Sequence, residues 1–203
     1  MSGSGVDAAV AALRRGELAV IPTETVYGLA AMPYRREPVE RLYALKGRDA
    51  AQPSALVVSG VELLLEHVPE LDGRAVAIAR ALLPGPFTLV LPNPGRRFPW
   101  LAGAVPDAIG VRVPAVAGPG AEVLAQVGAL AATSANLPGG PEPRRLADVP
   151  AELTAGCAAA VDGGELPGVP STVLDFTGPE PRVVREGAAP SAEAIRRVAA
   201  ALA

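Results

Sequence analysis

The sequence predicts a single domain of α/β or α+β class, in which helices cover both faces of a mixed sheet. Continuous apolar runs of strand length alternate with amphipathic stretches of helical period. Strands also follow one another directly between residues 158 and 185, which favours a mixed sheet over a purely parallel one. The 203 residues suit one domain over 1–203, because no repeat, charge block or long linker divides them.

Helices are predicted where apolar residues recur at helical spacing and where glycine, proline or serine marks an end. Val6, Val10 and Leu13 share one face of the first helix, and Gly16 stops it. The other helices are expected over Pro38–Leu45, Gly73–Leu82, Ala121–Val127, near Leu146–Leu153, and from Ser191 onward.

Strands are predicted for the apolar runs that turn residues bound. They are Glu17–Ile21, Ala55–Val58, Phe87–Leu91, Ile109–Val113, Leu130–Ala132, Ala158–Val161, Thr172–Phe176 and Arg182–Arg185. In open α/β sheets, ligands bind in the loops at strand ends, so the polar residues there are the functional candidates.

Composition excludes several classes of function. A net charge of −3, a pI near 5.3 and 3% aromatic residues argue against a general nucleic-acid-coating or base-stacking surface. Single Cys157 and His67 exclude an internal disulfide and the common Cys- or His-rich metal sites, so no metal ligands are predicted. We interpret Cys157 as a small core residue and His67 as an exposed helix residue.

The sequence also predicts the compartment. Residues 1–7 have neither the basic patch nor the apolar core of a secretory signal. The most apolar region, 75–91, is interrupted by arginine, glycine and proline, and is too broken to span a membrane. A cytoplasmic protein without a membrane partner is therefore expected.

Lys46 is the only lysine among the 18 Lys and Arg residues, and it is followed closely by Arg48. A lysine ammonium is a narrow point charge, whereas a guanidinium is a wide planar fork. The pair suggests an anion pocket. The alternative is that the sequence has exchanged lysine for arginine elsewhere without selection and that Lys46 remains by chance. The pocket interpretation predicts that Lys46→Arg weakens nucleotide binding with little change in stability, whereas the alternative predicts no effect.

Four polar clusters interrupt or follow the apolar strands. They are Pro22–Leu29, Lys46–Arg48, Thr133–Asn136 and Pro170–Thr172, joined by the isolated Arg112 and Arg185. These clusters supply hydroxyl groups, turns and cations, but no histidine base, cysteine nucleophile or carboxylate pair lies near them in the sequence. Such a set suits phosphate binding and catalysis by positioning of the substrates. Taken singly, each cluster can equally be a helix cap, an Asx turn or a surface cation.

No Gly-x-x-x-x-Gly-Lys-Ser/Thr loop and no Gly-x-Gly-x-x-Gly after a strand occurs, so a bound nucleotide requires another arrangement.

The order and spacing of these motifs resemble the YrdC-like family, whose best-known members are threonylcarbamoyl-AMP synthases. The resemblance runs from about residue 6 to 190. Its parts are Pro22–Leu29, Lys46-Gly47-Arg48, Pro84–Leu91, Val111–Pro114, Ser134-Ala135-Asn136, Ser171-Thr172-Val173 and Arg185-Glu186-Gly187.

The resemblance implies a twisted, mostly mixed open sheet with a concave, basic cavity. It also implies a nucleotidyltransferase that forms threonylcarbamoyl-AMP and pyrophosphate from L-threonine, bicarbonate and ATP, with Mg²⁺ assisting. The product would pass to a tRNA threonylcarbamoyl-transferase complex. Carried over by position, the threonine site comprises Thr25, Arg112, Ala132 and Ser171. The ATP site comprises Lys46, Arg48, Gln52, Ser134, Asn136 and Arg185, with Lys46 and Arg48 as catalytic cations.

The sequence departs from the family pattern at several places. Asp49 stands where proline is frequent and adds a carboxylate beside the two cations, which weakens their field. Val57 replaces a frequent histidine, and Glu142 replaces a hydroxyl residue. The other departures are Thr133, Val169-Pro170 and Glu186.

Two alternatives use the same fold. One is a non-catalytic module that binds tRNA or double-stranded RNA in the cavity, which the acidic pI and few aromatics disfavour. The other is carbamoyl transfer from carbamoyl phosphate, as in the related domain of hydrogenase-maturation proteins, which the absence of their accessory segments disfavours.

Overall fold

A computed structural model of the chain describes residues 3–49 and 51–203, and within these ranges the strands form one nine-stranded sheet. Its order is β7-β1-β2-β6-β3-β5-β4-β8-β9. The strands are β1 (Ala19–Pro22), β2 (Tyr27–Ala31), β3 (Ala55–Val58), β4 (Phe87–Pro92), β5 (Ala108–Arg112), β6 (Ala129–Ser134), β7 (Ala159–Ala160), β8 (Thr172–Asp175) and β9 (Arg182–Arg185).

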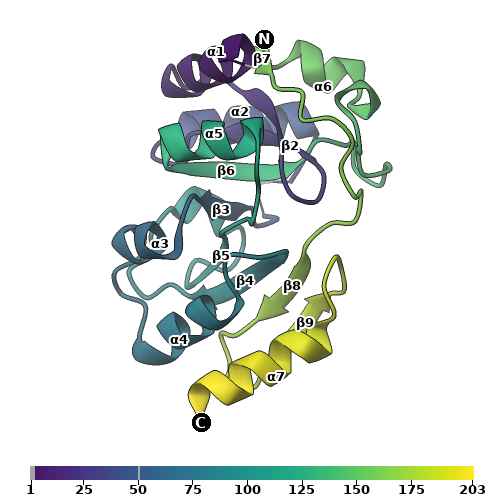
Figure 1. The fold of residues 1–203 in the computed structure, drawn as a ribbon. Helices are drawn as coiled ribbons and strands as arrows, with labels where there is room; N and C mark the ends of the chain where they lie inside the picture. The colour runs from purple at the N-terminus through teal and green to yellow at the C-terminus, as the bar shows by residue number, and fades with distance from the viewer. Residues whose placement is uncertain (1–2, 50) are drawn as a thin grey trace.

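The sheet is mixed, as the sequence predicts. The pairs β1–β7, β3–β5 and β4–β8 are parallel, and the remaining neighbours are antiparallel. Figure 1 shows the N- and C-terminal helices at opposite ends of the molecule.

The α-helices are α1 (Gly3–Arg14), α2 (Arg36–Lys46), α3 (Val61–His67), α4 (Gly73–Leu82), α5 (Pro119–Val127), α6 (Ala151–Ala155) and α7 (Ser191–Leu202). Two short 3₁₀ turns, η1 (Pro99–Leu101) and η2 (Leu146–Asp148), complete the elements. None of the helices within the described ranges combines the length and the apolar character that crossing a bilayer requires.

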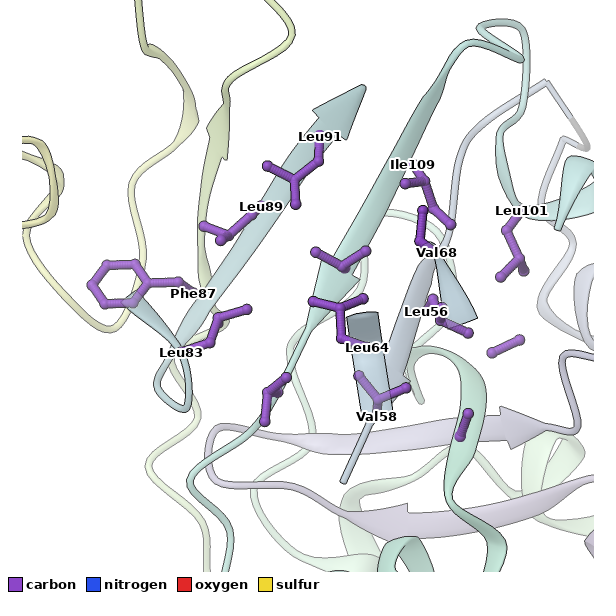
Figure 2. Close-up of a cluster of buried hydrophobic side chains, with 14 of the residues drawn as sticks. Leu56, Val58, Leu64, Val68, Leu83, Phe87, Leu89, Leu91, Leu101 and Ile109 are labelled. Carbon is purple, nitrogen blue, oxygen red and sulfur yellow. The ribbon is translucent and has the colours of Figure 1, made fainter. Parts of the chain in front are cut away.

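Helices cover one face of the sheet along almost its whole width. Apolar residues of α2, α3, α4 and α7 pack there against alternate residues of the strands, from Val20 of β1 to Leu174 of β8. Figure 2 shows the part of this core in which Leu56, Leu64, Leu89 and other labelled side chains meet. Burial of these side chains supplies the main driving force for folding.

The opposite face is covered over only half of its width. Here α1 and α5 pack together on β1, β2 and β6, through residues such as Val10, Ile21, Leu124 and Leu130. No helix in the described ranges continues this layer over β5, β4 and β8, where alternate residues stay partly exposed. The prediction that both faces are fully covered is therefore wrong for this half.

Three further differences from the predicted elements have local causes. No strand is predicted at β2, because the polar residues Thr23–Thr25 lie just before it and its first residues are assigned to the polar cluster Pro22–Leu29. The bounds of the helix α3 are not predicted, although His67 is interpreted as a helix residue, since α3 is only seven residues long. The helix predicted near 146–153 is divided into η2 and α6 at Pro150, which cannot donate a backbone hydrogen bond.

We predict that Leu89→Ala lowers the free energy of unfolding by about 2–5 kcal/mol, because Leu89 is fully buried between β5 and β8. Leu202→Ala removes the same atoms from a side chain that is 44% exposed, and should change stability by well under 1 kcal/mol, about the size of an ordinary surface substitution. Urea unfolding of both variants checks this. Equal losses would contradict the assigned core.

Candidate active site

A cavity of about 610 Å³ lies over the uncovered half of the sheet. Its floor is a set of side chains that point to one face from neighbouring strands. They are Ala55, Thr88, Val90, Ala108, Gly110, Arg112, Ala132, Ser134, Val173 and Asp175. The site therefore lies across a sheet face, not only in the loops at strand ends that the sequence indicated.

Small residues give the cavity its depth. Ala55, Gly110 and Ala132 are register partners on adjacent strands and occupy the centre of the floor. A Cβ atom on Gly110 would meet only Ser54 O at 3.6 Å and Ala55 Cα at 3.7 Å, which are ordinary contacts. The backbone thus tolerates alanine there, and the missing side chain serves the cavity instead.

A second cavity of about 420 Å³ adjoins the first and shares Arg48, Thr133 and Ser134 with it. Lys46, Gln52 and Asn136 line only the second cavity. Arg112, Ala132, Ser171 and Arg185 line only the first. Thr25 is buried, and its hydroxyl accepts a hydrogen bond from Arg112 Nη2 at 2.7 Å. The structure thus brings all ten predicted site residues together, while their individual roles stay predictions.

Lys46 ends α2 and is only 6% exposed. Its Nζ donates hydrogen bonds to Ser134 O and Asn136 Oδ1, both at 2.6 Å, and to Asn136 O. These three acceptors use all three protons of the ammonium. The pKa of Lys46 is lowered to about 8, chiefly by burial; Glu142 opposes the shift and Arg48 adds to it.

Arg48 lies at the boundary between the cavities. Its Nη1 donates to Thr133 Oγ1 at 3.0 Å and its Nη2 to Pro53 O, while its Nε is buried without a partner in the described chain. Burial lowers the pKa of Arg48 below its ordinary value. The two cations of Lys46-Gly47-Arg48 thus repel one another in a partly dry site.

Arg112 and Glu24 form an ion pair at 2.9 Å, and each side chain is only 12% exposed. The pair is electrostatic and not a hydrogen bond, since neither Glu24 oxygen receives an aligned donor from any described residue. Arg112 Nε is likewise buried and without an acceptor among the described residues. This guanidinium therefore keeps a free donor beside the cavity that it lines.

Arg185 ends β9 and contacts Ser171. Its Nη2 donates to Ser171 O at 2.8 Å, and its Nε to the same oxygen at 3.1 Å. Ser171 Oγ lies 2.7 Å from Thr88 Oγ1. Partial burial lowers the pKa of Arg185, with Arg112 lowering it further and Glu142 raising it. A bound anion next to Arg185 would relieve this repulsion between neighbouring cations.

Glu142 and Asp49 are the two carboxylates beside these cations, and they differ in their surroundings. Asp49 lines the second cavity, but its Oδ1 accepts a hydrogen bond from Ala51 N at 2.8 Å in an exposed turn. Glu142 lines the first cavity and raises the pKa of both Lys46 and Arg185. The sequence identified both carboxylates as departures and assigned the weakening of the field to Asp49, and the structure adds Glu142 to it.

The sequence analysis placed Glu24 and Thr133 in candidate polar clusters without assigning them a role, and it missed Thr88 as a member of the site. Thr88 alternates with the buried Phe87 and Leu89 along β4, so a strict period-2 inspection of that strand could have found it. Thr133 and Ser134 belong to β6 and not to a turn beyond it. Nothing in the sequence signals that Glu24 and Arg112, 88 positions apart, form a pair.

The predictions for the single histidine and the single cysteine have different outcomes. His67 is in a helix but only half-exposed: its ring stacks on Phe98, and its Nε2 lies 2.9 Å from Tyr34 Oη, so the expected exposed residue is wrong. Cys157 packs against the core, and burial raises the pKa of its thiol to about 11. Within 3–49 and 51–203, no three His, Cys, Asp or Glu side chains cluster as a metal site.

The geometry of Lys46 revises the expected effect of Lys46→Arg. A guanidinium cannot place its donors on three oxygens that surround one ammonium, so we predict a loss of about 1–3 kcal/mol of stability in addition to weaker nucleotide binding. Arg36→Lys, at a side chain 65% exposed, is the matched control and should be silent. Thermal unfolding with and without nucleotide separates the two effects.

Stability should also depend on pH through Lys46. Its folded pKa is about 8 against an ordinary value of 10.5, so between these values the unfolded chain holds more protons than the folded one. The free energy of unfolding should therefore rise with pH across this window. Lys46→Met removes this contribution, and denaturant unfolding at pH 7 and 9.5 measures the difference. The same pH dependence in both proteins would contradict the shifted pKa.

Comparison with known proteins identifies relatives of this chain. The Sua5/YciO/YrdC family model, described as "Telomere recombination", matches residues 11–187. Threonylcarbamoyl-AMP synthase of Pyrococcus abyssi is 35% identical over 182 residues, covering 89% of this chain and 53% of that protein. The synthase of Xanthomonas axonopodis pv. citri is 37% identical over 161 residues, covering 78% of this chain and 85% of that protein.

Solved structures agree with this. The crystal structure of P. abyssi Sua5 complexed with L-threonine is 33% identical, with a TM-score of 0.86 over 95% of this chain and 56% of that one. This chain therefore spans about half the length of the P. abyssi protein. The family model spans most of the sequence and the whole sheet from β1 to β9, so the chain belongs to the Sua5/YciO/YrdC family.

Proposed function

We propose that this chain forms threonylcarbamoyl-AMP and pyrophosphate from L-threonine, bicarbonate and ATP. The observation that carries the proposal is the pair of joined cavities, one holding Arg112, Ser171 and Arg185 and the other Lys46, Arg48 and Asn136. Relatives at 35% and 37% identity are named threonylcarbamoyl-AMP synthases, and one related structure contains L-threonine. The reaction makes the enzyme a nucleotidyltransferase.

The first cavity suits the amino acid. Arg112 offers a buried, free Nε to the threonine carboxylate, and Thr25 and Glu24 fix its guanidinium from below. Ser171 and the small Ala132 border the same space. A charge-assisted hydrogen bond in such a site is about twice as strong as a neutral one.

The second cavity suits the triphosphate. Arg48 faces both cavities, so it can contact the phosphate that reacts, while Gln52, Ser134 and Asn136 supply polar groups around it. Lys46 contributes a positive charge, and it holds Asn136 and the end of β6 in place. Arg185 lines only the first cavity, so a contact with the nucleotide requires that ATP reach across the junction at Arg48 into that cavity.

The chemistry needs positioning more than proton transfer by a side chain. The α-ammonium of threonine loses one proton to solvent, and the neutral amine attacks bicarbonate. The C–N bond forms and the C–OH bond breaks, which gives a carbamate and water. A carbamate oxygen then attacks the α-phosphorus of ATP, and the bond to the bridging β-phosphate oxygen breaks to release pyrophosphate. The reactants are anions that repel one another, and fixed cations at the junction of the cavities make their approach tolerable.

Mg²⁺ fits this site as a companion of ATP. The described residues contain no cluster of three metal-ligating side chains, so the donor set does not form a resident metal site. Mg²⁺ prefers phosphate oxygens and water with at most one or two carboxylates. We therefore treat it as part of the nucleotide substrate, where it would neutralise charge on the phosphates.

The product is a reactive mixed anhydride, and we propose that a tRNA threonylcarbamoyl-transferase receives it. Direct binding of tRNA or double-stranded RNA by this chain stays a prediction. Glu142 and Asp175 in the cavity lining would oppose a phosphate backbone there.

Purified protein incubated with Mg²⁺, ATP, bicarbonate and radiolabelled L-threonine should release pyrophosphate and accumulate labelled threonylcarbamoyl-AMP. Reactions without threonine or without bicarbonate serve as controls. A folded protein that releases no pyrophosphate in a threonine- and bicarbonate-dependent way would contradict the proposal.

Arg112→Met should raise the KM for threonine by roughly ten- to a hundredfold, because one charge-assisted contact to the carboxylate is lost. The KM for ATP should change much less, since Arg112 does not line the second cavity. Steady-state kinetics with each substrate varied checks this, with Arg36→Met as the exposed control. An equal rise in both constants would contradict the assignment of Arg112 to the amino acid.

A further inference from the structure

Several buried polar atoms near the first cavity have no hydrogen-bond partner among the described residues, including Arg48 Nε, Ser54 Oγ and the Glu24 oxygens. Two more belong to cavity-lining side chains of opposite charge. One is the donor Arg112 Nε, and the other is the acceptor Glu142 Oε2. A buried polar group without a hydrogen bond destabilises the folded protein, more so when its side chain is charged. Both side chains line this cavity, so a ligand there lies next to both charges.

The two groups are close enough to act on the same third residue. Arg112 lowers the pKa of Arg185 and Glu142 raises it. A ligand that carries only negative charge would gain from Arg112 and be repelled by Glu142. A ligand with an anion and a cation a few bonds apart would gain from both.

The other carboxylates of the site are already engaged. Glu24 does not line the cavity and is paired with Arg112. Asp175 lines it, but its Oδ1 accepts from Thr177 N and Oγ1, and its Oδ2 is paired with Arg182 at 2.7 Å. Glu142 is therefore the carboxylate that remains open to a ligand.

The loop that carries Glu142 is held at both sides. Asn136 Nδ2 donates to Gly140 O at 2.7 Å, and Pro143 O accepts from Tyr27 N at 3.1 Å. Asn136 is in turn bonded to the Lys46 ammonium. The carboxylate is thus attached to the same framework as the cations and does not need to be ordered by the ligand.

We propose that Glu142 binds the α-ammonium of the amino acid substrate while Arg112 binds its carboxylate, which makes Glu142 the residue that selects a zwitterion. The inference rests on the proposed amino-acid substrate but not on the adenylation step. Glu142 distinguishes an α-amino acid from the same acid without its amine. It also holds the nitrogen at a fixed place beside the cations, where bicarbonate must bind.

The test compares L-threonine with 3-hydroxybutanoate, which keeps the carboxylate and the hydroxyl but has no amine. Calorimetric titration should show that the wild-type protein prefers L-threonine at pH 7. Glu142→Gln should weaken L-threonine binding roughly ten- to a hundredfold and leave 3-hydroxybutanoate unchanged or tighter. Glu142→Asp, which keeps the charge on a shorter stem, should retain part of the preference.

Glu180→Gln, at an exposed carboxylate outside the cavity, is the matched control and should bind both ligands as the wild type does. A thermal melt of each variant reports its folding. A loss that is equal for both ligands, or one that appears only with Mg²⁺ and ATP, would overturn the assignment.

The outcomes also separate this inference from the proposed function. Threonylcarbamoyl-AMP synthesis by Glu142→Gln with an unchanged threonine KM would overturn the role of Glu142 and leave the reaction standing. A wild-type protein that binds a different α-amino acid, with the same dependence on Glu142, would support the role and overturn threonine as the substrate. Failure of the wild type to bind any α-amino acid would overturn the role.

Discussion

The bond network around the Lys46 ammonium is the interaction on which the rest of the site depends. One side chain joins the last residue of α2 to the end of β6 and to the loop that follows it. The helix covers one face of the sheet and the cavity occupies the other, so this lysine connects the core with the site. Burying its charge is unfavourable, and three oxygen acceptors in one small space make it tolerable.

The same network explains why the chain keeps a lysine here while using arginine elsewhere. Two of the acceptors are backbone carbonyls, whose positions the sheet and the loop determine. A tetrahedral ammonium can point one proton at each of three converging oxygens, whereas a guanidinium spreads its donors in a plane. Shape as well as charge therefore decides the residue at this position.

The unequal covering of the sheet creates the space for chemistry. On the β1–β2–β6 side both faces are packed, and β1 and β2 are buried throughout. On the β5–β4–β8 side one face is free, and the strands alternate between core residues such as Leu89 and cavity residues such as Thr88. A ligand bound there rests on a rigid surface, while charged side chains reach it from the edges.

The sequence predicted the mixed sheet and most of its strands, and it named ten residues that the structure brings together around two cavities, because apolar runs, turn residues and ordered motifs are local signals. It could not predict the open half-face, since covering depends on where helices such as α1 and α5 pack. The sequence placed Lys46 in an anion pocket, but it could not show that the side chain is buried and that three oxygens of the protein accept its hydrogen bonds. The pairing of Glu24 with Arg112 and the free oxygen of Glu142 likewise depend on residues distant in sequence.

The small residues in the cavity floor make the folded protein less stable than larger residues at the same positions could make it. Gly110 has room for a methyl group, and glycine in a strand is less favourable than alanine because it loses more backbone freedom on folding. Larger side chains in the floor would stabilise the sheet and make the cavity shallower. Selection for thermal robustness and selection for turnover therefore act in opposite directions on the same few atoms. A thermophilic relative has to find its added stability elsewhere in the fold, or accept a smaller substrate.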